Sequence, residues 1–112
     1  MSAVTTQPEY LLVLTTCASE EEARKIAEAL VTEHAAACCN IVPGLHSIFF
    51  WKDNLEHDRE VLLLIKTTVG SFPRVRETIS KLHSYEVPEI IALPVVDGAG
   101  TYLRWVSEQT HS

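Results

Sequence analysis

The sequence is short of basic residues, and that shortage excludes one large class of partners. Its 112 residues include 9 Lys and Arg against 15 Asp and Glu, which gives a net charge of −6 at pH 7. The basic residues are scattered along the chain, so no stripe of positive charge is available to neutralise phosphates. We therefore expect no nucleic-acid partner.

The sequence also lacks a hydrophobic run long enough to cross a membrane. Its longest aliphatic stretches, Leu11–Leu14 and Val61–Ile65, fall far short of the roughly 20 residues that a membrane helix needs. The first nine residues are polar and lack the basic start and apolar stretch of a signal peptide. The 3 cysteines are an odd number without the spacing of a disulfide scaffold, which indicates a reducing compartment. We expect a cytoplasmic protein with no membrane partner.

Familiar catalytic motifs are missing as well. The sequence contains no GxGxxG, no Walker phosphate loop, no HExxH, no CxxC and no GxSxG. A helix expected to begin at Ser19 follows a strand, and helix starts of this kind often bind phosphate. Here Glu20–Glu22 place negative charge at that end, so we expect no phosphate to bind there. With no nucleophile–base pair to start from, we predict that the protein is not an enzyme; a small hydrolase is the weakest alternative.

What is present indicates one domain of alternating strands and helices. The chain is 46% hydrophobic, which suffices for a single core spanning residues 1–112, with residues 1–9 expected to form a flexible tail. Apolar and β-branched runs predict strands, and apolar residues at the helical repeat predict helices. The expected elements are a strand Tyr10–Cys17, a helix from Ser19 to about Ala36, a hairpin within Cys38–Thr68, a helix opened by Gly70 and Ser71, a strand Glu89–Val96 and a short helix around Tyr102–Val106.

This order, β-α-β-β-α-β plus a C-terminal helix, predicts an α+β protein with the ferredoxin-like antiparallel sheet. Right-handed crossovers give the strand order 4-1-3-2 and place both long helices on one face. Pro94 within the last strand suggests an edge or a break in pairing. The apolar face of the second helix is expected to contain Phe72, Val75, Ile79 and Leu82. Since the first and fourth strands are antiparallel neighbours, Thr15–Cys17 should lie near the loop His83–Glu89.

The predicted hairpin is too long for the domain that carries it. Its strands Ile41–Trp51 and Leu55–Thr68 are joined only by the polar turn Lys52–Asn54. Eleven extended residues span roughly 36 Å, twice the length of an ordinary strand of about 5–6 residues. Phe49–Trp51 place aromatic side chains on both faces of the tip, where a solvated end should be polar. We expect another copy of the same chain to cover this ribbon.

The loop His83–Glu89 is the strongest candidate for chemistry. It combines an imidazole, a phenol and carboxylates within seven residues, HSYEVPE. Imidazole and carboxylate ligands suit divalent transition metals, and Cys17 at the facing strand end would add a thiol that favours copper or zinc. The alternative is a histidine that complements the dipole at the end of its helix, followed by an ordinary turn fixed by Pro88.

Other candidates have simpler structural explanations. Cys38 and Cys39 are expected to be small core residues rather than a redox pair, because adjacent Cα atoms lie too close for a disulfide. Lys66 is either a cation that faces a ligand or the end of a strand reaching solvent. The stretch His57–Glu60 is expected to be solvated or to form salt bridges between subunits. His34, His46 and His111 are interpreted as incidental.

Several segments together resemble one known family, the CutA divalent-cation tolerance proteins. The resemblance covers nearly all of residues 10–106, with its segments in the family's order. These segments are Ala36–Gly44, Ser47–Trp51, Glu60 through Lys66–Thr68, His83–Ile90 and Tyr102–Trp105.

The resemblance implies a homotrimer similar to the PII signal-transduction proteins, whose long hairpins extend each sheet into the neighbouring subunit. It also implies binding of copper or other divalent cations through a cysteine near the end of the first strand and a histidine before a Tyr-x-x-Pro-Glu element. His83 matches that histidine. Thr15 stands at the cysteine position, with Cys17 two residues later, and Leu82 stands where a second histidine can occur.

From the residues and the resemblance together we predict a homotrimer that responds to metal ions. The expected Cu²⁺ ligands are His83, Cys17 and Glu89, in a cleft between subunits. The alternative is a PII-like sensor or scaffold with incidental metal binding, in which the cleft holds a small organic ligand. The lining residues expected for that ligand are Tyr85, Lys66, Trp51 and Glu60.

Overall fold

A computed structural model of the chain describes residues 9–111. Apart from Glu9, the predicted N-terminal tail lies outside these residues. A short 3₁₀ turn at Val69–Ser71 precedes the second helix. The elements are β1 (Tyr10–Cys17), α1 (Glu20–Thr32), β2 (Cys38–Trp51), β3 (Asn54–Thr68), α2 (Phe72–Leu82), β4 (Ile91–Pro94) and α3 (Gly100–Gln109). Within the described range, no helix is long and apolar enough to cross a membrane.

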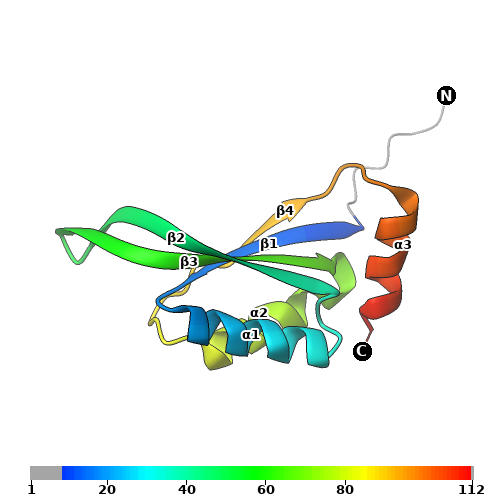
Figure 1. Ribbon diagram of the computed structural model, residues 1–112, viewed down its shortest axis with the longest axis horizontal. Helices are drawn as coiled ribbons and strands as arrows, with labels where there is room; N and C mark the ends of the chain where they lie inside the picture. Colours follow the sequence, from blue (N-terminus) through cyan, green and yellow to red (C-terminus); the bar gives the residue numbers. More distant parts are fainter. Residues whose placement is uncertain (1–8, 112) are drawn as a thin grey trace.

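The four strands form one antiparallel sheet in the order β2-β3-β1-β4, which confirms the predicted α+β ferredoxin-like topology. Figure 1 shows α1 and α2 side by side on one face of this sheet, and α3 at the end opposite the hairpin tip. β1 is central because its side chains are apolar or β-branched on both faces. The buried core between sheet and helices includes Val13, Leu63, Ile65, Ile26, Leu30, Val75 and Ile79.

Helix α1 begins as predicted but ends earlier. Ser19 caps it, because its hydroxyl accepts a 3.1 Å hydrogen bond from the Glu22 amide. The prediction that it continues to Ala36 is wrong, because His34 adopts a left-handed conformation with φ of 59°. The amides of His34 and Ala35 then donate back to Val31 and Leu30 at 3.1 and 3.0 Å, which is a Schellman ending.

The hairpin is as long as predicted and projects from the body of the domain (Figure 1). β2 has 14 residues and β3 has 15, paired up to Trp51 and Asn54. Only Lys52 and Asp53 form the turn, both at positive φ, as in the type I′ turns that suit two-residue hairpins. The chain measures 52 × 32 × 22 Å. Phe50 near the tip is 74% exposed, so nothing within the described residues 9–111 of one chain covers it.

Two expectations near the C-terminal half are corrected. The fourth strand is only Ile91–Pro94 and not Glu89–Val96, because Pro94 has no amide hydrogen to continue the ladder and β4 lies at the sheet edge. Leu82, expected on the buried face of the second helix, is 46% exposed. It occupies the last turn of α2, beyond the reach of the core.

Candidate metal centre

Three chain segments meet at the base of the hairpin, where β1 ends, α1 begins and α2 ends. The direct link is a 2.7 Å hydrogen bond from the His83 ring to the Thr16 carbonyl. This bond confirms the predicted proximity of the end of β1 to the loop after α2. The segments that follow these elements therefore form one site, although residues 16 and 83 lie 67 positions apart in sequence.

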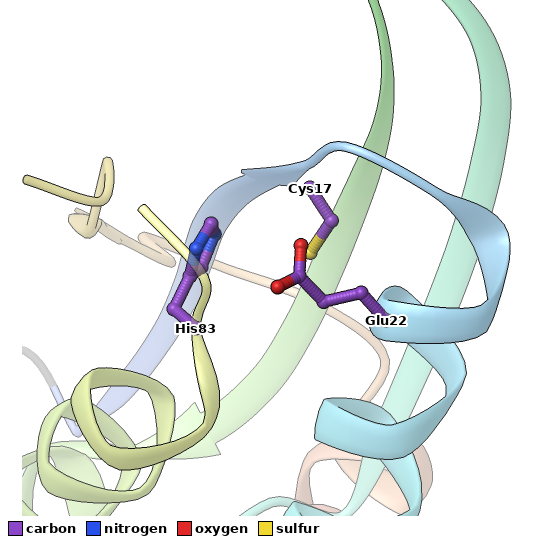
Figure 2. Close-up of side chains that lie close together, drawn as sticks. All are labelled: Cys17, Glu22 and His83. Atoms are coloured by element: carbon purple, nitrogen blue, oxygen red, sulfur yellow. The ribbon is translucent and has the colours of Figure 1, made fainter. Parts of the chain in front are cut away.

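Cys17, Glu22 and His83 place three potential metal ligands together at this point. Their ligand atoms all lie within 4.8 Å of one another. Figure 2 shows the Glu22 carboxylate between the Cys17 sulfur and the His83 ring. A thiolate, a carboxylate and an imidazole are the donors that zinc and copper accept. The donor set thus fits a thiophilic divalent ion.

His83 is buried and held in one tautomer. Its Nδ1 faces the Tyr85 amide at 3.1 Å, and its Nε2 faces the Thr16 carbonyl at 2.7 Å. An amide N–H only donates and a carbonyl only accepts, so the neutral ring carries its proton on Nε2. Nδ1 therefore holds the lone pair that a metal ion would take, in exchange for the Tyr85 hydrogen bond.

Glu22 is ionised and anchored by backbone amides. It accepts hydrogen bonds from the Ser84 amide at 2.7 Å and from the Ala18 amide at 3.2 Å. Burial alone would raise its pKa, but the hydrogen bonds from Ser84 and Ala18 outweigh that effect and lower the pKa below its ordinary value. Glu22 therefore brings a fixed negative charge to the site.

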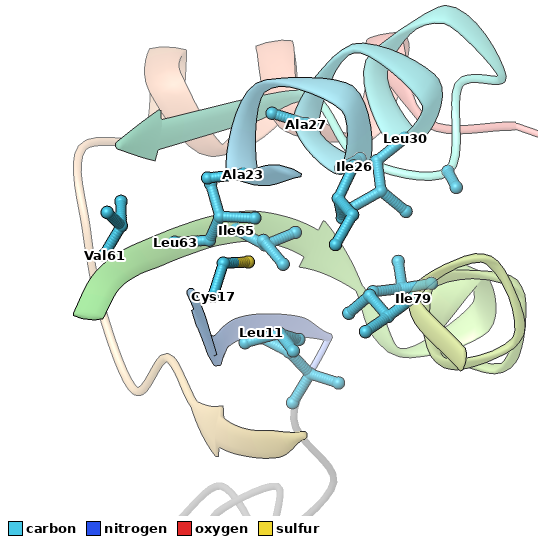
Figure 3. Close-up of a cluster of buried hydrophobic side chains, with 14 residues drawn as sticks. Leu11, Cys17, Ala23, Ile26, Ala27, Leu30, Val61, Leu63, Ile65 and Ile79 are labelled. Carbon is cyan, nitrogen blue, oxygen red and sulfur yellow. The ribbon is translucent and has the colours of Figure 1, made fainter. Parts of the chain in front are cut away.

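Cys17 is a fully buried thiol beside that charge. Figure 3 shows its side chain among the aliphatic residues of the core, including Ala23 and Leu63. Burial, followed by the charges of Glu22 and Glu60, raises the pKa of the Cys17 thiol to about 12. The thiol is protonated at neutral pH, and a cation that binds here must displace its proton.

The structure brings two of the three predicted metal ligands, Cys17 and His83, close together and places the third elsewhere. Glu89 lines a neighbouring pocket and is not part of the cluster, while Glu22 takes its place. The sequence interpretation assigned Glu22 only to the cap of α1. A usable signal was nevertheless present, because a helix that begins three residues after Cys17 must start at the same sheet edge as the His83 loop.

A pocket of about 700 Å³ lies beside this centre, between the hairpin and the loop after α2. It contains three of the predicted ligand-binding residues, Trp51, Glu60 and Tyr85. The Tyr85 hydroxyl donates a 2.6 Å hydrogen bond to Glu60, and burial together with that carboxylate raises the tyrosine pKa. Among residues 9–111, no Lys or Arg lines the pocket. Its carboxylates and aromatic rings belong to Asp58, Glu60, Glu86, Glu89, Phe49, Trp51 and Tyr85.

Lys66, the fourth predicted ligand-binding residue, is not in that pocket. It lies near the other end of β3, where it pairs with Leu12 and Cys38 and its ammonium group donates to the Asn40 side chain. Six residues of extended chain, roughly 20 Å, separate it from Glu60. Lys66 lines instead a smaller apolar hollow next to α3.

Comparisons with known proteins agree with this architecture. The family model for the CutA1 divalent ion tolerance protein matches residues 11–109. The divalent-cation tolerance protein CutA of Thermus thermophilus is 54% identical over 99 residues, which is 88% of this chain and 96% of that protein. Mouse protein CutA is 45% identical over 87% of this chain, which spans only 55% of the mouse protein.

Solved structures give the same result. The Thermus thermophilus Cut A1 structure superposes with a TM-score of 0.89 at 52% identity, covering 91% of this chain and 99% of that one. CutA1 from Shewanella sp. SIB1 superposes with a TM-score of 0.91 at 39% identity, covering 95% and 99%.

Proposed function

The chain belongs to the CutA1 divalent ion tolerance family, and from that membership we propose that it binds a divalent transition-metal ion, Cu²⁺ foremost, through Cys17, Glu22 and His83. The observation that carries the proposal is the convergence of thiol, carboxylate and imidazole within 4.8 Å. Cu²⁺ is favoured because it forms the most stable complexes of the divalent first-row ions with such ligands.

Each residue has a distinct part in this proposal. Cys17 gives up its proton and supplies a thiolate, the softest of the three donors. Glu22 keeps the Ser84 and Ala18 amide bonds that orient its carboxylate, so it needs no rearrangement. His83 supplies Nδ1, while its Nε2–H remains bonded to Thr16 and fixes the plane of the ring.

The protein is further proposed to act as a homotrimer. The support is the apolar surface that one chain leaves uncovered on the hairpin and on β4. Ile48, Phe50 and Leu55 are 61%, 74% and 56% exposed, and β4 at the opposite edge of the sheet adds Ile91 and Leu93. Contacts of the hairpin and of β4 with neighbouring chains would bury this surface. Sedimentation equilibrium should give about three times the chain mass of 12.5 kDa; a stable single-copy species would contradict the trimer.

The metal proposal is tested with Co²⁺ as a spectroscopic probe. A thiolate-to-metal charge-transfer band appears only when a cysteine ligates the ion, so its loss in a single-cysteine variant identifies the ligand. We expect the band in the natural protein and in the matched control Cys38→Ser, a half-exposed thiol away from the site. The band should be absent in Cys17→Ser and weakened in His83→Asn. A band that persists in Cys17→Ser would overturn the assignment.

A second candidate function rests on the pocket beside the metal centre. We propose that it holds a small organic cation, in line with a PII-like sensor. In the part of the chain that the structure describes, four carboxylates and three aromatic rings line it without any Lys or Arg, the combination that stabilises an ammonium group against π faces. Thermal-shift assays with choline and spermidine, against neutral and anionic analogues of similar size, should show stabilisation by the cations alone. Equal shifts for an anionic analogue would contradict it.

A further inference from the structure

Two histidines on the hairpin form a close pair that the proposed metal centre does not use. His46 on β2 lies opposite Arg59, and His57 on β3 lies opposite Ile48, so the two rings are diagonal neighbours across the ladder. The distance from His46 Nε2 to His57 Nδ1 is 3.2 Å. The ring centroids are 5.4 Å apart and the planes are tilted by 60°. Both side chains are exposed in the single chain, and they lie closer to the base of the hairpin than the apolar pair Phe50 and Leu55.

The separation of the two nitrogens matches that of two ligands on one metal ion. With zinc–nitrogen distances of about 2.0–2.1 Å, ligand pairs at right or tetrahedral angles lie about 2.9–3.4 Å apart. At 3.2 Å only one hydrogen fits between the two nitrogens. A small rotation of either exposed ring turns both lone pairs toward a shared ion, which then replaces that hydrogen.

The hairpin holds these rings in place. The type I′ turn at Lys52 and Asp53 fixes the register from the tip, and a bulge between Val42 and Leu45 fixes it from the base. His46 and His57 therefore remain diagonal neighbours as long as the ladder is intact. An ion held by both would tie β2 to β3.

We propose that His46 and His57 form a second divalent-metal site, independent of Cys17, Glu22 and His83, for ions that prefer imidazole: Cu²⁺, Ni²⁺ and Zn²⁺. Water completes the coordination. Arg59 opposite His46 adds a positive charge to this face, so binding depends on coordination bonds and not on general attraction. Hard oxygen-seeking ions such as Mg²⁺ and Ca²⁺ are excluded.

The two metal sites are distinct in position. His57 lies four residues from Val61, the β3 partner of Cys17, which is roughly 13 Å of extended chain. The alternation of β3 side chains places His57 on the same face as buried Val61 and Leu63, whereas Glu60 faces the pocket. Substitutions at one metal site therefore leave the ligands of the other unchanged.

The test is retention of the untagged protein on Cu²⁺- and Ni²⁺-iminodiacetate columns. The natural protein and Cys17→Ser/His83→Asn should be retained alike and elute with imidazole. His46→Asn and His57→Asn should each elute early, because one imidazole alone binds weakly. The matched control is His111→Asn. His111 stacks on His34 with centroids 4.2 Å apart and planes tilted by 22°. Because imidazole lone pairs lie in the ring plane, two nearly parallel stacked rings do not aim them at one ion, and this pair offers no chelate.

Solution titration provides the second readout. Zn²⁺ should occupy two sites per chain in the natural protein and one in His46→Asn/His57→Asn, with the remaining site still dependent on Cys17. Mg²⁺ should give no signal. Unchanged column retention in both single variants, with native circular dichroism spectra, would overturn the proposal. Loss of retention in Cys17→Ser/His83→Asn would also overturn it, since that would place the column-binding site at the other centre.

Discussion

Tyr85 connects the candidate metal centre to the neighbouring pocket through Glu60. Its hydroxyl donates to the Glu60 carboxylate at 2.6 Å, and its amide donates to His83 Nδ1 at 3.1 Å. Glu60 is only 7% exposed, so the phenol is its main compensation for burial. Tyr85 thus contacts both candidate sites. A metal ion bound to His83 Nδ1 would also displace the hydrogen bond from the Tyr85 amide.

Removing the Tyr85 hydroxyl should destabilise the fold. Tyr85→Phe leaves the buried Glu60 carboxylate without its donor, which we expect to lower the free energy of unfolding by about 1–3 kcal/mol. The matched control is Tyr10→Phe. The Tyr10 hydroxyl forms a hydrogen bond with Ser107 at an exposed position, so its loss should have little effect on stability. Urea unfolding measures both. Equal losses in the two variants would contradict a special role for Glu60.

The same pair predicts a dependence on alkaline pH. The pKa of Tyr85 is raised in the folded protein, so the folded state keeps a proton that the unfolded chain loses near pH 10. The stabilisation that Tyr85 contributes is therefore fully present below the pKa of the unfolded chain. It is lost as the pH rises from that value toward the pKa of the folded protein. The stability difference between the natural protein and Tyr85→Phe should therefore shrink above about pH 10. A constant difference would contradict the linkage.

Glu22 and Glu89 should differ in their effect on metal binding. Glu22→Gln removes the only carboxylate within the cluster, and we expect Co²⁺ affinity to fall at least about tenfold. Glu89→Gln, in the neighbouring pocket, should leave it unchanged. Absorption titration at the thiolate band compares them directly. A loss of Co²⁺ affinity in Glu89→Gln but not in Glu22→Gln would favour the ligand set predicted from sequence, which contained Glu89.

Glu22 also predicts a dependence on acidic pH. Because its folded pKa is lowered, its stabilising effect is present above the unfolded value of about 4.3 and is lost as the pH falls toward the folded value. Glu22→Gln should flatten this part of the stability curve. The side chain is partly exposed, so the change should stay below about 1 kcal/mol.

Two buried threonines should respond in opposite directions to the same substitution. The Thr15 hydroxyl is fully buried and has no hydrogen-bond partner within the described range of the chain, so Thr15→Val should raise the free energy of unfolding by about 1 kcal/mol. Thr67 is equally buried, but its hydroxyl donates to the Ala35 carbonyl at 2.6 Å. Thr67→Val should lower stability by about 1–2 kcal/mol. Urea unfolding measures both; a loss in Thr15→Val would mean that the hydroxyl has a partner.

The fold was predictable because each element carries its own local signal. The apolar run of β1 and the cap at Ser19 specify where strands and helices begin. The end of α1 was not predictable, because Ala35–Ala37 favour helix by propensity. Tertiary contacts decide it: the left-handed His34 is held by the Gln109 carbonyl and by stacking on His111, and both partners lie about 75 residues further along the chain.

The location of the candidate site was predictable from the sequence, but its complete set of ligands was not. The antiparallel neighbours β1 and β4 required Cys17 and the His83 loop to share one edge, and the structure confirms this. Glu22 was missed because a role in capping α1 accounts for this residue without any contact to the loop. In the structure its carboxylate also accepts a hydrogen bond from the Ser84 amide of that loop. Lys66 was misplaced because its position along β3 depends on the register with β1, which sequence does not show.

The proton on Cys17 provides the sharpest test of the metal centre. With the thiol pKa raised to about 12, the free site is protonated throughout the neutral range, and a bound ion must release one proton. Zn²⁺ affinity should therefore rise about tenfold per pH unit between pH 6.5 and 8, and calorimetry in buffers of different ionisation enthalpy should report one proton released per ion. These titrations use His46→Asn/His57→Asn, which leaves only the first site. Cys17→Ser in that background should release no thiol proton and bind more weakly. Zn²⁺ uptake without proton release would show that Cys17 is not a ligand, because no thiolate exists beforehand to accept the ion.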